Sequence, residues 1–391
     1  MGWIVKIALI TTGLGNVWRG YERFAFDLFD LLKEEIDITL FKGAGETNSR
    51  EKVIPHLGRD RFLSRIPWLR NASRGPYYFE VLSFLTFLLP HLISERYDIV
   101  HFTDCPLANF FFHLRTKLKL DLHFRTLYTN GNPVIDFSCA RVDFLHQLTP
   151  GQVEALMAFG IPESKIILLP FGVHSNRFGA SGIQDTRNRL CAKYGIQQSK
   201  RVILAVSAIN RLHKRIDYLI DEVARLGPEY FLLVAGHMED RSVEALAKRL
   251  LYDRFKFIHI PFEELNQIYQ LADVFVMCSL VEGFGLAFVE AMCARVPVIA
   301  HLSPHYRWMV GDERSLTDLT VENNLSGKIK ELLGDPEMAK EIVDRNYASA
   351  VERFDWAFLK NRYIEMYRSV AQSSKGSTTF SCHSKAIVQI V

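Results

Sequence analysis

The chain has 391 residues, of which 48% are hydrophobic and 23% are charged. This composition can form a large core, which excludes global disorder, collagen-like repeats and small disulfide scaffolds, and the length favours two domains. The net charge of +3 gives no indication of a nucleic-acid partner, because proteins that bind phosphate backbones usually carry a larger basic excess.

The first half of the chain alternates short β-branched or aromatic runs with longer segments of helical period. We predict strands over 4–10, 37–41, 98–103, 121–127, 144–148 and 165–169, and helices over 22–35, 80–95, 107–117 and 151–159. This βαβα alternation favours a parallel, doubly wound sheet.

A polar stretch over 171–194 lacks a clear period, and a second alternation follows it. Strands are predicted over 202–206, 231–235, 255–260, 274–277 and 298–300, each separated by a helix. We therefore predict four parts: a Rossmann-like domain over 1–175, a second Rossmann-like domain over 196–355, a C-terminal helix over 356–370 with a return to the first domain as one option, and a tail over 371–391.

The six cysteines include no CxxC pair and no Cys/His cluster with zinc-site spacing. Scattered free thiols fit a reducing cytoplasm, so we expect a cytoplasmic protein. The longest apolar stretch, 81–93, is too short to span a bilayer.

The strongest functional signal follows the predicted strand 274–277. Glu282-Gly283-Phe284-Gly285 leads into a helix that carries Glu290. Ligands of open parallel sheets bind beyond the carboxyl ends of the strands, and helix-start N–H groups beside glycines can receive a phosphate. Two carboxylates would repel phosphate, but they can accept hydrogen bonds from ribose or hexose hydroxyls. A glycine-rich turn with one surface and one capping glutamate explains the spacing equally well.

A second signal follows the predicted strand 202–206. Arg211 and Lys214 could hold a diphosphate, one by a planar fork and the other as a point charge. Taken alone, a solvated basic loop is the simpler interpretation.

A third signal follows the first strand, where Gly13, Gly15 and Gly20 resemble a dinucleotide fingerprint. The last glycine falls five residues after Gly15 instead of three, which weakens that interpretation. A loose glycine loop that approaches a ligand is the simpler role. The sequence contains no P-loop, GxSxG or HExxH motif, and the absence of Asp-x-Asp disfavours a metal-dependent diphosphate site.

Together these segments resemble the family 4 glycosyltransferases, retaining enzymes of the GT-B fold in which two Rossmann-like domains face a central cleft. Residues 282–292 resemble the E-x7-E block of that family, 214–220 its basic phosphate loop, 168–173 its interdomain hinge and 20–23 its N-terminal glycine loop. The resemblance covers roughly residues 3–370.

The resemblance implies a catalytic set and a donor-binding set of residues, without a metal or another cofactor. The catalytic set is Glu282, Lys214 and Arg211, and the donor-binding set is Gly20, Phe284, Gly285, Leu286 and Glu290. In such enzymes the first glutamate contacts sugar hydroxyls, the second glutamate contacts the ribose, and the basic residues neutralise the leaving nucleoside diphosphate.

Two departures from the family pattern concern residues with implied roles. The family arginine, five residues before the lysine, corresponds here to Ile209, and Arg211 is the candidate replacement. No residue is assigned to the histidine that many members carry in the N-terminal domain, and His101 is a weak option.

The acceptor is expected to bind the N-terminal domain. Residues 50–74 hold seven basic and two acidic residues, interleaved with aromatic and aliphatic ones. Such a mixture suits an anionic membrane or a lipid-linked acceptor, although a solvated loop is slightly favoured.

The sequence therefore predicts a hexosyl- or related glycosyltransferase that moves a sugar from a UDP- or GDP-linked donor to a glycan, lipid-linked or other glycoconjugate acceptor. It would act in the cytoplasm, with contact to the inner face of the membrane through 50–74 as an option and without nucleic acid. Three alternatives stay open: an epimerase or phosphorylase of the same fold, a nicotinamide-dependent dehydrogenase that uses the Gly13–Gly20 loop, and a non-catalytic sugar-nucleotide binder.

Overall fold

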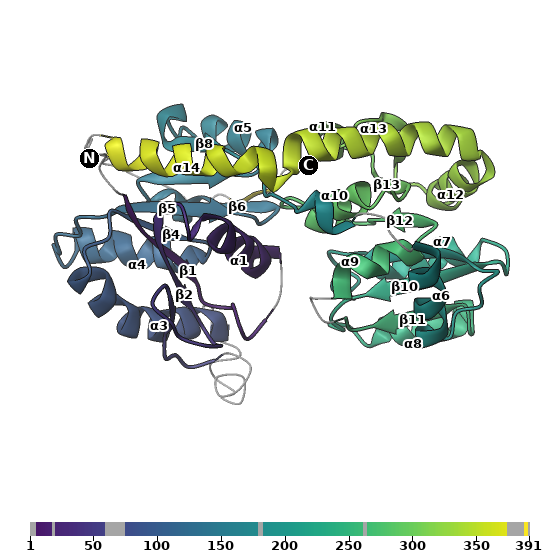
Figure 1. Cartoon of the computed structure of the whole chain (residues 1–391), viewed down its shortest axis with the longest axis horizontal. Helices are drawn as coiled ribbons and strands as arrows, with labels where there is room; N and C mark the ends of the chain where they lie inside the picture. The colour runs from purple at the N-terminus through teal and green to yellow at the C-terminus, as the bar shows by residue number, and fades with distance from the viewer. Residues whose placement is uncertain are drawn as a thin grey trace. The chain divides into compact units, whose positions relative to one another are not determined.

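The computed structural model describes residues 5–17, 20–58, 75–178, 183–260, 264–373 and 387–389. The chain divides into two compact units, Met1–Phe171 with Lys360–Val391, and Gly172–Leu359. The second boundary falls inside helix α14 (Trp356–Gln372), so the helix predicted over 356–370 contributes most of its length to the first unit (Figure 1).

The first unit is built on a seven-stranded sheet in the order β3-β2-β1-β4-β5-β7-β8. Every pair of neighbours in this sheet is parallel. Its strands are β1 (Lys6–Thr11), β2 (Asp37–Lys42), β3 (Glu51–Val53), β4 (Ile99–Phe102), β5 (Arg125–Asn130), β7 (Phe144–Gln147) and β8 (Ile166–Leu168). A separate antiparallel pair joins β6 (Val134–Asp136) to β15 (Ile387–Gln389), which lies in the predicted tail.

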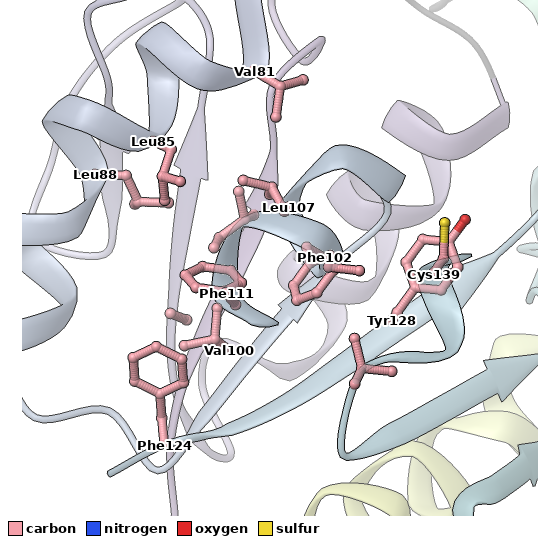
Figure 2. Close-up of a cluster of buried hydrophobic side chains, with 14 of the residues drawn as sticks. Val81, Leu85, Leu88, Val100, Phe102, Leu107, Phe111, Phe124, Tyr128 and Cys139 are labelled. Carbon is pink, nitrogen blue, oxygen red and sulfur yellow. The ribbon is translucent and has the colours of Figure 1, made fainter. Parts of the chain in front are cut away.

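The main helices of this unit are α1 (Gly20–Leu32), α3 (Gly75–Ser94), α4 (Cys105–Thr116) and α5 (Pro150–Ala158). Buried residues of α3 recur every three or four positions, which gives the helix one apolar side. Figure 2 shows that side, with Val81, Leu85 and Leu88 beside Leu107 and Phe111 of α4 in the core.

The second unit has a six-stranded parallel sheet in the order β11-β10-β9-β12-β13-β14. Its strands are β9 (Arg201–Val206), β10 (Tyr230–Ala235), β11 (Phe255–Ile258), β12 (Val274–Val276), β13 (Val298–His301) and β14 (Leu316–Thr317). Its helices are α6 (Ile183–Tyr194), α7 (Ile216–Ala224), α8 (Ser242–Leu251), α9 (Leu265–Ile268), α10 (Leu286–Cys293), α11 (Pro304–Met309), α12 (Asn324–Gly334) and α13 (Pro336–Phe354). Counted along the chain, the order is 3-2-1-4-5-6, the strand order of dinucleotide-binding folds.

Strand order reverses once in each sheet, between β1 and β4 in the first unit and between β9 and β12 in the second. Loops that leave two such strands in opposite directions open a crevice at their carboxyl ends, where open parallel sheets bind ligands. The two strongest predicted loops, after β9 and after β12, flank this position in the second unit.

Predicted boundaries differ from the structure in several places. The strand predicted over 121–127 lies at Arg125–Asn130, and the stretch 171–194, predicted without regular structure, contains α6 over Ile183–Tyr194. Among the described side chains of α6, Leu190 and Cys191 are the buried apolar ones. Two adjacent apolar residues do not produce the three-to-four-residue repeat by which a helix is predicted from sequence.

The expectation of scattered free thiols is wrong for two cysteines. Cys105, at the start of α4, and Cys139, in the 3₁₀-helix Phe137–Ala140, form a disulfide. The two cysteines are 34 residues apart, and no spacing pattern in the sequence pairs them. The parallel sheet brings their segments together in space. Cys191, Cys278 and Cys293 are free and buried.

A chain of buried hydrogen bonds crosses the core of the first unit. It runs from the Tyr367 hydroxyl to His101 Nδ1 (2.7 Å), from His101 Nε2 to the Thr129 hydroxyl (2.6 Å), from Thr129 to His146 Nδ1 (2.8 Å), and from His146 Nε2 to the Leu169 carbonyl (2.7 Å). The carbonyl can only accept, so His146 Nε2 carries a proton. In a neutral ring Nδ1 is then the acceptor, Thr129 donates to it and accepts from His101 Nε2, and Tyr367 donates to His101 Nδ1. This arrangement gives every donor in the chain an acceptor when both histidines are neutral.

Burial explains why these histidines remain neutral. It lowers the pKa of His101 well below the ordinary value, with a further contribution from His146. It lowers the pKa of His146 to about 4, although the bond to the Leu169 carbonyl opposes the shift. His101 thus has a structural role, since both of its ring nitrogens are occupied inside the core.

Candidate donor site

The candidate site of the second unit lies where two loops leave the sheet at its switch point. Residues 207–215 follow β9 and residues 277–285 follow β12, and these strands are hydrogen-bonded neighbours. Lys214 comes from the first loop and Glu282 from the second, so the parallel sheet joins residues that are 68 positions apart.

Lys214 Nζ donates to Glu282 Oε1, and the two side chains are 18% and 8% exposed. His213 Nε2 lies 4.0 Å from the same carboxylate and 3.1 Å from the Val281 carbonyl. Burial alone would raise the pKa of Glu282, but the Lys214 ammonium, His213 and the hydrogen bond from Lys214 lower it below the ordinary value. Glu282 is therefore ionised at neutral pH.

Asn210 shapes the loop that carries Lys214. Its Oδ1 accepts from the backbone N–H groups of His213 (3.1 Å) and Lys214 (2.9 Å), and its Nδ2 donates to Glu239 (2.8 Å). Sequence reasoning missed this residue, although an asparagine after a strand is a known turn-former that bonds to nearby backbone.

Arg215 completes this loop in the left-handed conformation, with a φ of +50°. Its guanidinium donates to the carbonyls of Cys278 and Leu319 at 3.3 and 3.0 Å. The bond to Cys278 ties the loop after β9 to the loop after β12, and the bond to Leu319 ties it to the segment after β14, so both bonds fix the approach of Lys214.

Gly285 is the N-cap of α10 and has a φ of +94°, which a residue with a side chain rarely adopts. Its carbonyl accepts from the N–H groups of Phe288 (2.9 Å) and Val289 (3.3 Å), so the helix begins directly after the glycine. No side chain caps this end, and Leu286 is the first helical residue. The start of α10 therefore presents partial positive charge, which suits an anionic ligand.

Glu290 lies within α10 and is 5% exposed. One of its carboxylate oxygens accepts from the Tyr269 hydroxyl at 2.7 Å. Tyr269 is fully buried, so it holds the carboxylate in one orientation. Sequence reasoning did not find this partner, because tyrosine gives no spacing signal.

His305, on α11, contacts the same loop. Its Nε2 donates to the Phe284 carbonyl at 3.0 Å, and burial lowers the pKa of His305 despite this bond and the nearby Glu282. The neutral imidazole therefore holds the backbone between Glu282 and Gly285.

Arg211 is not brought to the Lys214–Glu282 pair. Its guanidinium lies 3.5 Å from Asp240 and donates to the Ser242 carbonyl at 3.3 Å, beside the start of α8. Ile209, at the position of the family arginine, is 1% exposed and forms a bridge with Met238. Of the two basic residues predicted for this site, Lys214 lies beside Glu282 and Arg211 does not.

The glycine loop of the first unit is packed against its own surroundings. A Cβ at Gly13 would lie 2.2 Å from Glu22 Oε1, and one at Gly15, where φ is +90°, would lie 2.4 Å from the Ala44 carbonyl oxygen. The Glu22 carboxylate so close to Gly13 would repel a pyrophosphate, which argues against the dehydrogenase alternative. Gly20, the remaining predicted residue, is the first residue of α1.

Among the described residues, one group of three side chains has metal-ligating atoms close together: Cys105, Asp136 and Cys139. Its two cysteines are joined in the disulfide, and the group belongs to the first unit. The carboxylates of the candidate site instead pair with Lys214 and Tyr269.

Comparison with known proteins identifies the class of fold. Anabaena HepE, solved in complex with UDP and glucose, has a TM-score of 0.75 and 16% sequence identity, covering 93% of this chain and 100% of that one. The chain has the GT-B fold, as predicted.

The second unit carries the match to a family model. Residues 186–349 match the model described as glycosyl transferases group 1. They include both loops of the candidate site.

Two curated relatives match a similar part of the chain. N-acetyl-alpha-D-glucosaminyl L-malate synthase of Bacillus anthracis is 25% identical over 202 residues, which are 48% of this chain and 50% of that protein. GDP-mannose-dependent alpha-(1-6)-phosphatidylinositol monomannoside mannosyltransferase of Mycolicibacterium smegmatis is 29% identical over 228 residues, which are 54% of this chain and 57% of that protein. The chain thus spans about half the length of these relatives.

Proposed function

We propose that the protein is a retaining glycosyltransferase that takes a sugar from a nucleotide-diphosphate sugar without a metal ion. The observation that carries this proposal is the Lys214–Glu282 pair, which lies at the switch point of the second sheet beside the Gly285-capped start of α10. A cation and a helix N-terminus suit a diphosphate, and a carboxylate suits a sugar hydroxyl.

Each residue has a separate role in this proposal. The Lys214 ammonium and the first amides of α10 stabilise charge on the departing diphosphate, as a metal does in other enzymes. The ionised Glu282 accepts hydrogen bonds from sugar hydroxyls, and Glu290, oriented by Tyr269, accepts from the ribose. Arg211 is 41% exposed and would have to leave Asp240 to take part.

Retention of the anomeric configuration is consistent with front-face attack. The acceptor hydroxyl then approaches the anomeric carbon from the same side on which the diphosphate leaves. The bond between the acceptor oxygen and the anomeric carbon forms, the bond to the phosphate oxygen breaks, and the hydroxyl proton passes to the phosphate. No protein nucleophile is required.

The relatives support a donor linked to UDP or GDP. HepE was solved with UDP and glucose, and the mycobacterial relative is named for GDP-mannose. Their names give different acceptors, since one relative is named for L-malate and the other for phosphatidylinositol monomannoside. We propose a glycan, a lipid-linked sugar or another glycoconjugate as the acceptor. Action in the cytoplasm, at the inner face of the membrane, is part of this proposal.

Calorimetry and thermal-shift measurements with UDP-, GDP- and ADP-sugars, with and without EDTA, test the donor site. One donor should bind, with no effect of EDTA, and Lys214→Ala should weaken it by at least about tenfold because a charge-assisted hydrogen bond is lost. Lys248→Ala is the matched control, because Lys248 forms an exposed ion pair with Glu244 on α8. Absence of binding by every nucleotide sugar would refute the donor site.

Turnover tests the role of Glu282. Glu282→Gln should reduce transfer more than it reduces binding of the nucleoside diphosphate, whereas an equal loss of both would contradict a sugar-facing carboxylate. A glycosylated acceptor in the product mixture separates transfer from epimerisation, which returns the sugar on its nucleotide.

A further inference from the structure

The outer side of helix α3 is unusual for a surface helix because its one basic residue is a histidine, His91, which lies 3.5 Å from Glu95 just beyond the helix. Among the twenty residues of Gly75–Ser94, the carboxylate of Glu80 is the sole acidic group, and lysine and arginine are absent. Glu80 is 4% exposed and lies 3.9 Å from His56 Nε2, on the inner side of the helix. Surface helices of soluble domains normally place charged residues on the side that faces water.

Large apolar side chains occupy that outer side. Leu82, Phe87 and Ile93 are 38%, 53% and 49% exposed. Near the start of the helix, the Tyr78 ring lies 5.0 Å from that of Phe110 on α4, so an aromatic pair joins the two helices. The apolar surface therefore extends along α3 and onto its neighbour.

The inner side of α3 is fixed in the fold, with Val81, Leu85 and Leu88 in the core (Figure 2). Among the described helices, α3 alone is long and apolar enough by length and composition to cross a membrane, and the stretch predicted over 81–93 is longer in the structure. Crossing would remove these core residues from their partners. Contact with a surface needs only the outer side.

Basic residues border the apolar surface. After α4, Lys117 and Lys119 alternate with Leu118 and Leu120, which are 65% and 39% exposed. Neither lysine forms an ion pair with any residue of the described ranges. This loop leads into β5, whose Arg125 N–H donates to the Asp98 carbonyl (2.7 Å) just beyond the end of α3.

The sequence before α3 is also basic. Residues 50–74 hold seven basic and two acidic residues, of which 59–74 lie outside the described residues. An aromatic-containing surface without lysine, arginine or exposed carboxylates, bordered by the basic 117–120 loop, is complementary to an anionic lipid surface, where apolar side chains enter the interface and lysines face the headgroups.

We propose that the outer side of α3, together with the 117–120 loop, docks the first unit on an anionic lipid bilayer. This inference rests on the proposed function, since it supplies a means to reach an acceptor that is linked to a lipid. The bilayer contact belongs to the first unit, and the donor residues belong to the second.

Co-sedimentation of the full chain with vesicles tests the docking surface, without donor or acceptor present. The protein should sediment with vesicles of phosphatidylcholine mixed with phosphatidylglycerol and much less with phosphatidylcholine alone. Phe87→Asp with Ile93→Asp should reduce binding at least about tenfold, because two half-exposed apolar side chains are lost from the interface. Val321→Asp is the matched control, because Val321 is also 49% exposed but lies in the second unit.

The lysines have a separate expected effect. Lys117→Gln with Lys119→Gln should reduce binding to the anionic vesicles about fivefold for each lysine and leave the weak binding to phosphatidylcholine unchanged. Circular dichroism and melting curves that match the wild type establish that each variant is folded.

Two results would overturn the proposal. One is wild-type protein that stays in the supernatant with the anionic vesicles. The other is a wild-type protein that does not bind vesicles and forms a dimer that the α3 substitutions convert to a monomer. That result would assign this surface to a second copy of the chain. Donor calorimetry on the same variants separates the two proposals, since unchanged donor binding leaves the transferase proposal intact if docking fails.

Discussion

Acid should destabilise the first unit through the buried histidines of its hydrogen-bond chain, and His146 gives the clearest case. Its pKa is about 4 in the folded protein and 6.5 in the unfolded chain. Between these values the unfolded chain holds a proton on His146 and the native protein does not. Stability is therefore complete above pH 6.5 and falls as the pH decreases towards 4.

The size of the effect follows from proton linkage. One histidine contributes a slope of about 1.4 kcal/mol per pH unit and a total loss of about 3 kcal/mol over this range. His101, whose pKa is also lowered by burial, adds to the slope in the same direction. Below pH 4 His146 is protonated in both states, and its contribution to the slope ends.

Urea unfolding followed by circular dichroism over this pH range measures the slope. His146→Asn should lower the free energy of unfolding at neutral pH, because Thr129 and the Leu169 carbonyl lose a partner, but its pH slope should be shallower by about 1.4 kcal/mol per unit. Carboxylates with lowered pKa, such as Asp143, also lose stability in acid, but they do so equally in both proteins.

The control is His123→Asn, because His123 is exposed. Equal slopes for the wild type and His146→Asn would refute the neutral, fixed hydrogen-bond chain. A ring ¹⁵N spectrum with the proton on Nδ1 of His146 would refute it directly, since the Leu169 carbonyl requires the proton on Nε2.

Three further results are expected. His305→Ala should raise the KM for the nucleotide sugar, because the Phe284 carbonyl loses its hydrogen-bond donor. His305→Gln should bring the KM part of the way back to the wild-type value. Equal kinetics for both variants would exclude a positioning role. Arg215→Ala should lower the free energy of unfolding by about 1 kcal/mol more than Arg215→Gly, and therefore the Tm further. Both variants lose the guanidinium bonds, but alanine keeps the left-handed backbone strain. The reverse order would contradict this. A dithiol reductant should lower the Tm of the wild type, with a loss of about 4 kcal/mol of stability for a loop of 34 residues, and should have no effect on Cys105→Ser. An unchanged wild-type Tm would argue against the Cys105–Cys139 disulfide.

The parts of the fold that were predictable from the sequence are those set by local pattern. Alternating apolar runs predicted most strands to within a few residues, and parallel sheets then required the loops after β9 and β12 to end at the same edge. Lys214 and Glu282 therefore meet, although their sequence positions are distant.

The remaining features depend on contacts that have no local signature. Arg211 was expected at the diphosphate because of its spacing, but Asp240, which belongs to another loop, attracts its guanidinium. The bond between His101 and Tyr367 joins residues 266 positions apart. Neither partner could be found from periodicity, which reports burial and not hydrogen-bond geometry.

In the proposed transferase, the ion pair at the donor site would also bear on turnover. Because Lys214 and Glu282 neutralise each other, a ligand that engages one of them alone leaves the other without its partner. A free nucleoside diphosphate would take Lys214 from the 8% exposed Glu282 carboxylate, and breaking a buried pair in this way costs about 3–5 kcal/mol. A nucleotide sugar instead offers a phosphate to one and hydroxyls to the other. The pair would therefore oppose inhibition by the product, because its re-formation favours departure of the nucleoside diphosphate after transfer.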